Sequence, residues 1–133
     1  MKKLLTLFAA CIFGAVMVYA DVLKLQATSL AFKSQNDYGY WSDWSDWEST
    51  NILVVVNTDI DRVNIYSSSP QEYDIYDYDA EEKDGEGGTI STCHCIDQNG
   101  TRCDMRIRFQ ANGQVQLYVD YADFMFVYNV QRK

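Results

Sequence analysis

A two-residue alternation over the last third of the chain constrains the fold more than any other feature. Between residues 103 and 130, three consecutive runs alternate in this way, the third less cleanly, and Asn112-Gly113 and Ala122-Asp123 separate them. Such alternation, interrupted by turn residues, indicates an antiparallel meander with one buried face. The positions on that face are Cys103, Met105, Ile107, Phe109, Val115, Leu117, Val119, Tyr121, Phe124, Phe126, Tyr128 and Val130.

Five segments upstream of this meander have the composition of short strands separated by turn residues. They cover residues 22–32, 51–56, 62–67, 72–78 and 89–97. Short sequential connections favour pairing between strands that are neighbours in the chain. We therefore predict an all-β fold, a small antiparallel up-and-down meander of about eight strands closed as a barrel, because closure removes both sheet edges. A β-sandwich is the alternative.

Two local irregularities are also predicted. Apolar residues at 23, 25 and 27 change parity to 30 and 32, and a β-bulge near Thr28-Ser29 would place all five on one face. Residues 79–88, with the sequence DAEEKDGEGG, are expected to form a mobile, charged hairpin loop.

The first twenty residues resemble a secretory signal peptide in layout. Lys2 and Lys3 precede an apolar run, and Val18-Tyr19-Ala20 has small residues at the two positions that determine cleavage. The apolar run is short for a membrane span, and a lipoprotein cleavage box before Cys11 is the alternative. We expect a signal peptide over residues 1–20, a single β-barrel-like domain over residues 21–133, and export to the periplasm or the medium.

An excess of acidic residues limits the classes of partner. The chain has nineteen acidic and eleven basic residues, which gives a formal net charge of −8. Loss of Lys2 and Lys3 with the leader makes the remaining domain still more acidic. Such a surface repels nucleic acid and anionic lipid, so we expect neither nucleic acid nor, after leader cleavage, a membrane as partner. The expected partner is an unidentified small ligand, glycan or protein.

Three tryptophans at a spacing of three form the most conspicuous local motif, Trp41-Ser-Asp-Trp44-Ser-Asp-Trp47. The letters WSDWS resemble the WSxWS box of cytokine-receptor modules and thrombospondin repeats, in which tryptophans interleave with cations from a neighbouring strand. The cysteine framework of those modules is absent here. One interpretation is a structural plug that caps the core. The other is an aromatic barrel rim, where Trp41, Trp44 and Trp47 would bind a ligand or partner.

Three cysteines follow the leader, and an oxidising compartment favours one disulfide and one spare thiol. Gln98-Asn99-Gly100 suits a three-residue hairpin loop, which sets Cys95 opposite Cys103, so we predict that these two pair. A two-residue Asn-Gly turn would instead set Cys103 opposite Ile96. His94 lies between Cys93 and Cys95, but in a strand its side chain points away from both thiols, so no zinc or other cofactor is expected.

Several carboxylates could in principle give the chain a hydrolytic activity. Asp74, Asp77 and Asp79 could supply the carboxylate pair of a glycoside hydrolase, although no GxSxG elbow and no EF-hand spacing is present. We predict a non-enzymatic, exported binding or interaction domain. A hydrolase using paired carboxylates and a structural or inhibitory partner protein are the alternatives.

Several segments resemble a group of small, uncharacterised secreted bacterial proteins. They are the leader, the tryptophan segment, NILVVVNTDIDRVNIYS, CIDQNGTRCDMRIRF and LYVDYADFMFVYNV. The resemblance covers most of the chain after the leader, and it implies export and a compact domain without a known activity. The expected architecture is also similar to that of the lipocalins at the level of the fold.

The leader assignment predicts cleavage between Ala20 and Asp21 when the full chain is expressed with export. Sequencing the N-terminus of the exported protein should therefore give Asp21 as the first residue. A new terminus at a lipidated Cys11 would contradict the prediction.

Overall fold

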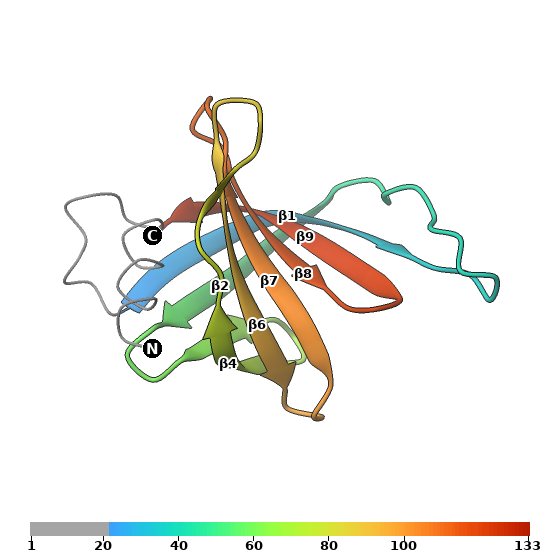
Figure 1. Cartoon of the computed structure of the whole chain (residues 1–133), viewed down its shortest axis with the longest axis horizontal. Helices are drawn as coiled ribbons and strands as arrows, with labels where there is room; N and C mark the ends of the chain where they lie inside the picture. The colour runs from blue at the N-terminus through green and yellow to red at the C-terminus, as the bar shows by residue number, and fades with distance from the viewer. Residues whose placement is uncertain (1–21) are drawn as a thin grey trace.

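A computed structural model describes residues 22–133, which form a closed antiparallel β-barrel (Figure 1). The strands are β1 (Val22–Ser34), β2 (Glu48–Asn57), β3 (Arg62–Tyr66), β4 (Gln71–Tyr78), β5 (Glu82–Lys83), β6 (Thr89–Asp97), β7 (Arg102–Phe109), β8 (Val115–Asp120) and β9 (Phe124–Arg132). Successive strands pair as neighbours except β4 and β5; β4 instead pairs with β6, and β1 pairs with β9. The prediction of an eight-stranded up-and-down barrel is confirmed, with β5 as an extra strand, and the sandwich alternative is wrong.

The leader and Cys11 lie outside the described residues, so the structure does not test them. Within the described part of the chain, no helix is long and apolar enough to cross a membrane.

The predicted bulge in the first strand is confirmed. The register of β1 against both β2 and β9 shifts between Ala27 and Ser29. Leu25 and Ala27 before the shift, and Leu30 after it, therefore all pack on the barrel core. The extra residue keeps the strand amphipathic while it bends around the barrel.

The hairpin between β6 and β7 also has the predicted three-residue loop. The Asp97 amide donates to the Thr101 carbonyl at 2.9 Å, and the Gly100 amide donates to the Asp97 carbonyl at 3.0 Å. Gly100 has a φ of 82°, a left-handed conformation that glycine adopts without steric cost. This loop sets Cys95 opposite Cys103, as the sequence predicts.

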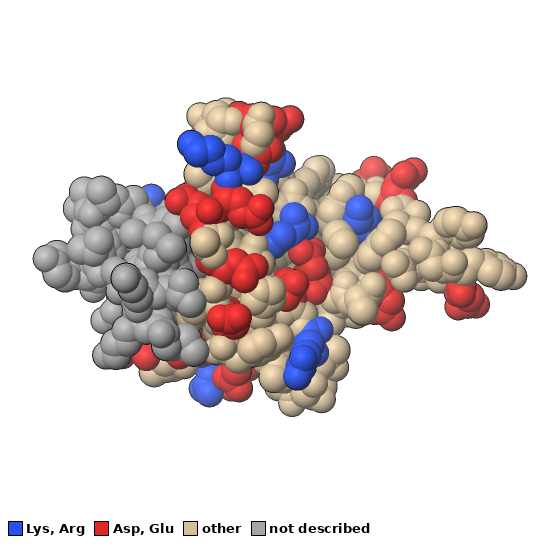
Figure 2. Space-filling model, viewed as in Figure 1, with Lys and Arg blue, Asp and Glu red and all other residues tan. Residues whose placement is uncertain are grey.

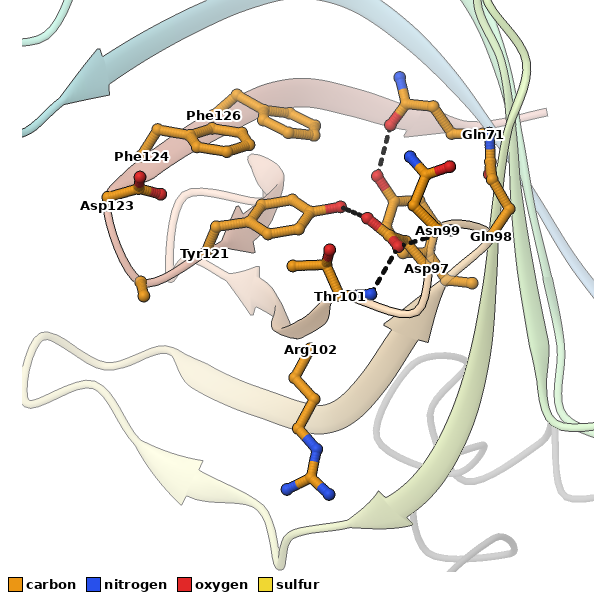
Figure 3. A pocket seen from close by; sticks show the side chains of 12 residues that line it. Gln71, Asp97, Gln98, Asn99, Thr101, Arg102, Tyr121, Asp123, Phe124 and Phe126 are labelled. Carbon is orange, nitrogen blue, oxygen red and sulfur yellow. Dashed lines mark hydrogen bonds between the residues drawn. The ribbon is translucent and has the colours of Figure 1, made fainter.

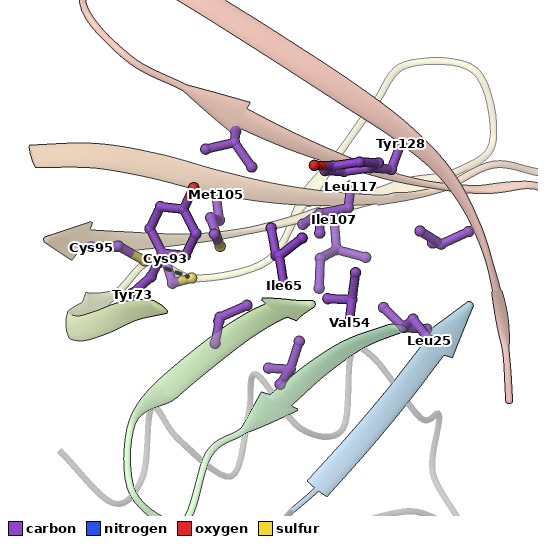
Figure 4. Packing of buried hydrophobic residues seen from close by; sticks show 14 of the residues in the cluster. Leu25, Val54, Ile65, Tyr73, Cys93, Cys95, Met105, Ile107, Leu117 and Tyr128 are labelled. Carbon is purple, nitrogen blue, oxygen red and sulfur yellow. Dashed lines mark hydrogen bonds between the residues drawn. The ribbon is translucent and has the colours of Figure 1, made fainter. Parts of the chain in front are cut away.

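Alternate residues of the long strands fill the middle of the barrel (Figure 4). Ile65, Tyr73, Met105 and Leu117 are among the largest side chains that are fully buried there. Burial of an aliphatic or aromatic side chain of this size contributes roughly 1.5–3 kcal/mol. The apolar face that the alternation defined is therefore the barrel interior, and it supplies most of the driving force for closure.

Residues 79–88 are more structured than a mobile loop. β5 pairs with β6 through Glu82 and Lys83, and the side chain of Asp84, which is almost completely buried, accepts hydrogen bonds from the amides of Glu86 and Gly88. Arg108 on β7 donates to Asp84 at 3.1 Å. The hairpin was predicted but its order was not, because its stabilising partner, Arg108, is distant in the chain.

The two ends of the barrel differ. One end carries the connections 58–61, 79–88 and 110–114. The other carries 67–70, 98–101, 121–123 and the long β1–β2 connection, residues 35–47, which projects as an extended arm (cyan in Figure 1). We call residues 35–47 the arm and this end of the barrel the mouth.

Gly88 tests how tightly the β5–β6 hairpin packs. A Cβ atom at this position would lie 2.3 Å from the Phe109 carbonyl oxygen and 2.5 Å from Asp84 Oδ2. Gly88→Ala should therefore lower the free energy of unfolding by about 2 kcal/mol in urea denaturation. Gly100→Ala, where the added methyl meets open space and only the positive φ opposes it, should cost less, about 1 kcal/mol. Equal losses in the two variants would contradict the steric argument.

Candidate functional site

A pocket of about 510 Å³ opens at the mouth of the barrel (Figure 3). It lies where the β3–β4, β6–β7 and β8–β9 connections approach one another. The residues that line it are Gln71, Tyr73, Asp97, Gln98, Asn99, Thr101, Arg102, Tyr121, Ala122, Asp123, Phe124 and Phe126. We call it the mouth pocket.

Aromatic rings from the β8–β9 hairpin form one wall of the mouth pocket. The rings of Tyr121 and Phe124 stack with centroids 4.5 Å apart and planes 15° apart, and Phe126 follows at 6.4 Å from Phe124. Phe126 in turn meets the buried Tyr128 edge to face at 5.5 Å. Phe124 is 40% exposed, whereas Tyr128 is buried. The wall therefore runs from the solvent into the core.

Asp97 organises the turn on the opposite side of the pocket. Its Oδ1 accepts hydrogen bonds from the amides of Asn99 and Thr101, both at 2.9 Å, and its Oδ2 accepts one from the Tyr121 hydroxyl at 2.7 Å. Partial burial alone would raise the pKa of Asp97, but these hydrogen bonds outweigh it and lower that pKa. Burial and the bond to Asp97 raise the pKa of Tyr121, so its hydroxyl stays protonated at neutral pH.

The glutamines at the mouth are also bonded within the protein. The Tyr73 hydroxyl donates to Gln71 Oε1, and Gln71 Nε2 donates to Ser67. Gln98 accepts from the Glu72 amide at 2.6 Å and donates to the Pro70 carbonyl at 3.1 Å. These polar groups therefore already have partners within the protein, whereas the Phe124 ring is 40% exposed and open to a ligand.

The tryptophans lie on the outside of the barrel end rather than in its core. The arm runs back along β1: the Ser42 and Ser45 amides donate to the carbonyls of Ser34 and Phe32, each at 2.8 Å. The two serine hydroxyls accept from the amides of the same β1 residues, at 3.1 and 2.9 Å. This ladder advances three residues on the arm for every two on β1, which explains the repeat of three.

Each tryptophan remains substantially exposed, so the plug interpretation is wrong. Trp41, Trp44 and Trp47 are 38%, 39% and 49% exposed. The Lys33 ammonium lies 5.5 Å from the ring centroid of Trp41 and 4.8 Å from that of Trp44. The arrangement is similar to the interleaving for which the WSxWS box is known, and we call the three rings the tryptophan strip.

A second cation, Arg106, continues the strip across the sheet. Trp44 meets Tyr118 on β8 with centroids 6.2 Å apart, and the Arg106 guanidinium lies 4.2 Å from the Tyr118 ring. Arg106 also donates to Asp120 at 3.1 Å. Tyr118 pairs in register with Val127, which is buried on the outer face. The strip therefore covers apolar surface on the outside of the barrel as well as facing solvent.

The predicted disulfide is not formed, although its register is. Cys93, Cys95 and Cys103 are all free and buried, and the close sulfur contact is Cys93 to Cys95 at 3.7 Å. Burial raises the pKa of Cys103 to about 12. The contact with Cys93, together with burial, raises the pKa of Cys95 as well. Cys95 and Cys103 are therefore protonated, packed thiols. The disulfide was predicted from the number of cysteines and the strand register, and that prediction did not consider the contact between Cys95 and Cys93.

His94 points outward, away from the cysteines, as the strand geometry predicts. Its Nδ1 lies 2.6 Å from Asp104 Oδ1 and its Nε2 lies 2.9 Å from Asp79 Oδ1. Each carboxylate needs an N–H donor, so this geometry requires the doubly protonated imidazolium. The bond to Asp79 and then that to Asp104 raise the pKa of His94 despite partial burial. No pattern in the sequence indicated this pairing.

The carboxylates considered for hydrolysis do not converge on the mouth pocket. Asp74 pairs with Arg62, Asp79 pairs with His94, and Asp77 accepts a hydrogen bond from the neighbouring Tyr78 amide. Among the described residues, no group of three or more histidine, cysteine, aspartate or glutamate side chains could hold a metal ion. These acids act here as ion-pair and turn partners on the barrel wall.

Comparison with known proteins adds no family to this description. No family model matches the chain, and no curated protein matches it either. The candidate sites therefore rest on their own geometry.

The imidazolium at His94 predicts a specific pH dependence of stability. The paired form is present in full below the unfolded pKa of about 6.5, and its contribution is lost as the pH rises through the higher folded pKa. Urea denaturation should show the native protein losing stability over this interval. His94→Gln, which removes the only histidine of the chain, should lose this dependence. Parallel stability curves for the two proteins would contradict the assignment.

Proposed function

We propose that this chain is a non-enzymatic binding domain that holds a small, flat and largely apolar ligand in the mouth pocket. The observation that carries the proposal is the stacked wall of Tyr121, Phe124 and Phe126 at the edge of a pocket of about 510 Å³. Pockets of roughly 300–1,000 Å³ with apolar walls and a few placed polar groups are typical of small-molecule sites.

The hydrogen bonds around the pocket support a ligand with few polar groups. Asp97 and Asp123 both line it, but both oxygens of Asp97 are occupied by protein donors. A hydrolase of the predicted kind would need two free carboxylates that face each other in the pocket. Asp74 and Asp79 cannot supply them, because both are held in ion pairs elsewhere. A planar ring or a short aliphatic chain could instead stack on Phe124 without displacing any of these bonds.

Export forms part of this proposal and rests on the leader sequence. A carrier or sensor of small apolar compounds outside the cytoplasm would need a stable scaffold with one accessible site. The barrel provides such a scaffold, because its centre is packed and its mouth pocket is open.

The binding proposal is tested with N-phenyl-1-naphthylamine, a neutral aromatic probe whose fluorescence rises in apolar surroundings. It should bind saturably to the native protein. Phe124→Ala should weaken binding about tenfold, since removal of one ring contact costs on the order of 1.4 kcal/mol. Phe124 is partly exposed, so the variant should still fold.

Ile60→Ala serves as the matched control, because Ile60 is 56% exposed and lies in the β2–β3 turn at the opposite end of the barrel. It should leave the affinity unchanged. Absence of saturable binding, or equal weakening by the two substitutions, would overturn the proposal.

A further inference from the structure

The tryptophan strip contains two similar intervals, of which one is filled by a cation. Lys33, on the outer face of β1, lies between the rings of Trp41 and Trp44. The hydrogen bonds of Ser42 and Ser45 to β1, which we call the serine ladder, keep the arm antiparallel to β1. The interval from Trp44 to Trp47 therefore lies beside β1 residues that precede Lys33. Two residues before Lys33, on the same face of that strand, is Ala31, which has no charge to offer. The second interval therefore has no cation from β1, and because Ala31 is itself only 1% exposed, a cation can reach these rings only from their solvent-facing side.

Exposed acidic residues neighbour Trp44 and Trp47 in the sequence. Asp43 and Asp46 alternate with the tryptophans, Glu48 follows Trp47, and all three acids are exposed. Within residues 22–133, none of them forms an ion pair. Trp47 is the most exposed of the three rings. Uncompensated carboxylates beside exposed indole faces provide both attractions that a guanidinium or ammonium group uses.

We propose that the tryptophan strip is a docking surface for a basic segment of a partner protein, with an arginine or lysine side chain stacking on the exposed side of Trp44 and Trp47. The cation would stack on these rings as Lys33 stacks on Trp41 and Trp44, and it would pair with Asp46. A second copy of this chain does not suit the surface, because its formal net charge of −8 would repel the same acids. This surface is separate from the mouth pocket.

The position of the arm suits this role. It projects beyond the barrel wall at the mouth end (Figure 1), so an extended partner segment could lie along it without meeting the rest of the barrel. The serine ladder fixes the arm backbone against β1 before any partner binds. Since the arm backbone is already held, binding would cost little backbone conformational entropy in this chain.

The test uses a short synthetic peptide with arginine at every third position and a matched peptide with neutral citrulline in its place. The indole N–H signals of the full chain are followed by NMR during titration. The arginine peptide should shift the signals of Trp44 and Trp47, and the citrulline peptide should not. Asp46→Asn should weaken binding about fivefold, and Trp47→Ala should weaken it about tenfold.

Asp59→Asn is the control for net charge, because it removes the same charge from an exposed residue in the β2–β3 turn at the other end of the barrel. It should leave the affinity nearly unchanged. Equal weakening by Asp46→Asn and Asp59→Asn would show a diffuse charge attraction only and would overturn the proposal. Unshifted Trp44 and Trp47 signals, with a natively folded protein, would overturn it as well.

Discussion

Pairing of β1 with β9 is the interaction on which the rest of the molecule depends. It joins the first and last strands and removes the two edges that an open meander would expose. The contact is long, running from Leu25 opposite Arg132 to Ser34 opposite Phe124. Only a strand that bends can follow the barrel over such a length, and the bulge between Ala27 and Ser29 allows β1 to do so. Closure of the barrel therefore depends on the bulge in β1.

The same pair of strands contributes to two different surfaces, one on its inner face and one on its outer face. Phe126 faces the barrel interior, where its ring joins the aromatic wall of the mouth pocket. Lys33 pairs in register with Met125, one position away, and faces outward into the tryptophan strip. Side chains alternate across a strand, so neighbouring residues serve separate surfaces. A binding event at one surface therefore need not involve the other.

Local patterns in the sequence were enough to predict the scaffold. Alternation identified the strands, parity identified the bulge at Thr28-Ser29, and turn chemistry at Gln98-Asn99-Gly100 identified the β6–β7 register. Each of these depends on residues that are close in the chain.

What the sequence could not predict depends on residues that are far apart in the chain. The Asp84–Arg108 pair that orders residues 79–88, the two carboxylates at His94 and the aromatic wall of the mouth pocket all require the closed barrel. The tryptophan repeat was recognised, but its location was not. Its ladder to β1 uses serine hydroxyls, which carry no apolar periodicity.

The distribution of charge separates the barrel wall from the arm. Over the wall, acidic and basic groups lie side by side (Figure 2), and Arg62, Arg106 and Arg108 each hold a carboxylate. These arginines neutralise part of the acidic charge of the wall, although Asp59, Glu81 and Glu82 are also exposed there. Beside the arm, Lys33 of β1 stacks on the rings of Trp41 and Trp44, while Asp43 and Asp46 of the arm stay unpaired within the described chain. What distinguishes the arm is that its unpaired carboxylates lie in the same segment as exposed tryptophan rings, and a cationic partner uses both attractions.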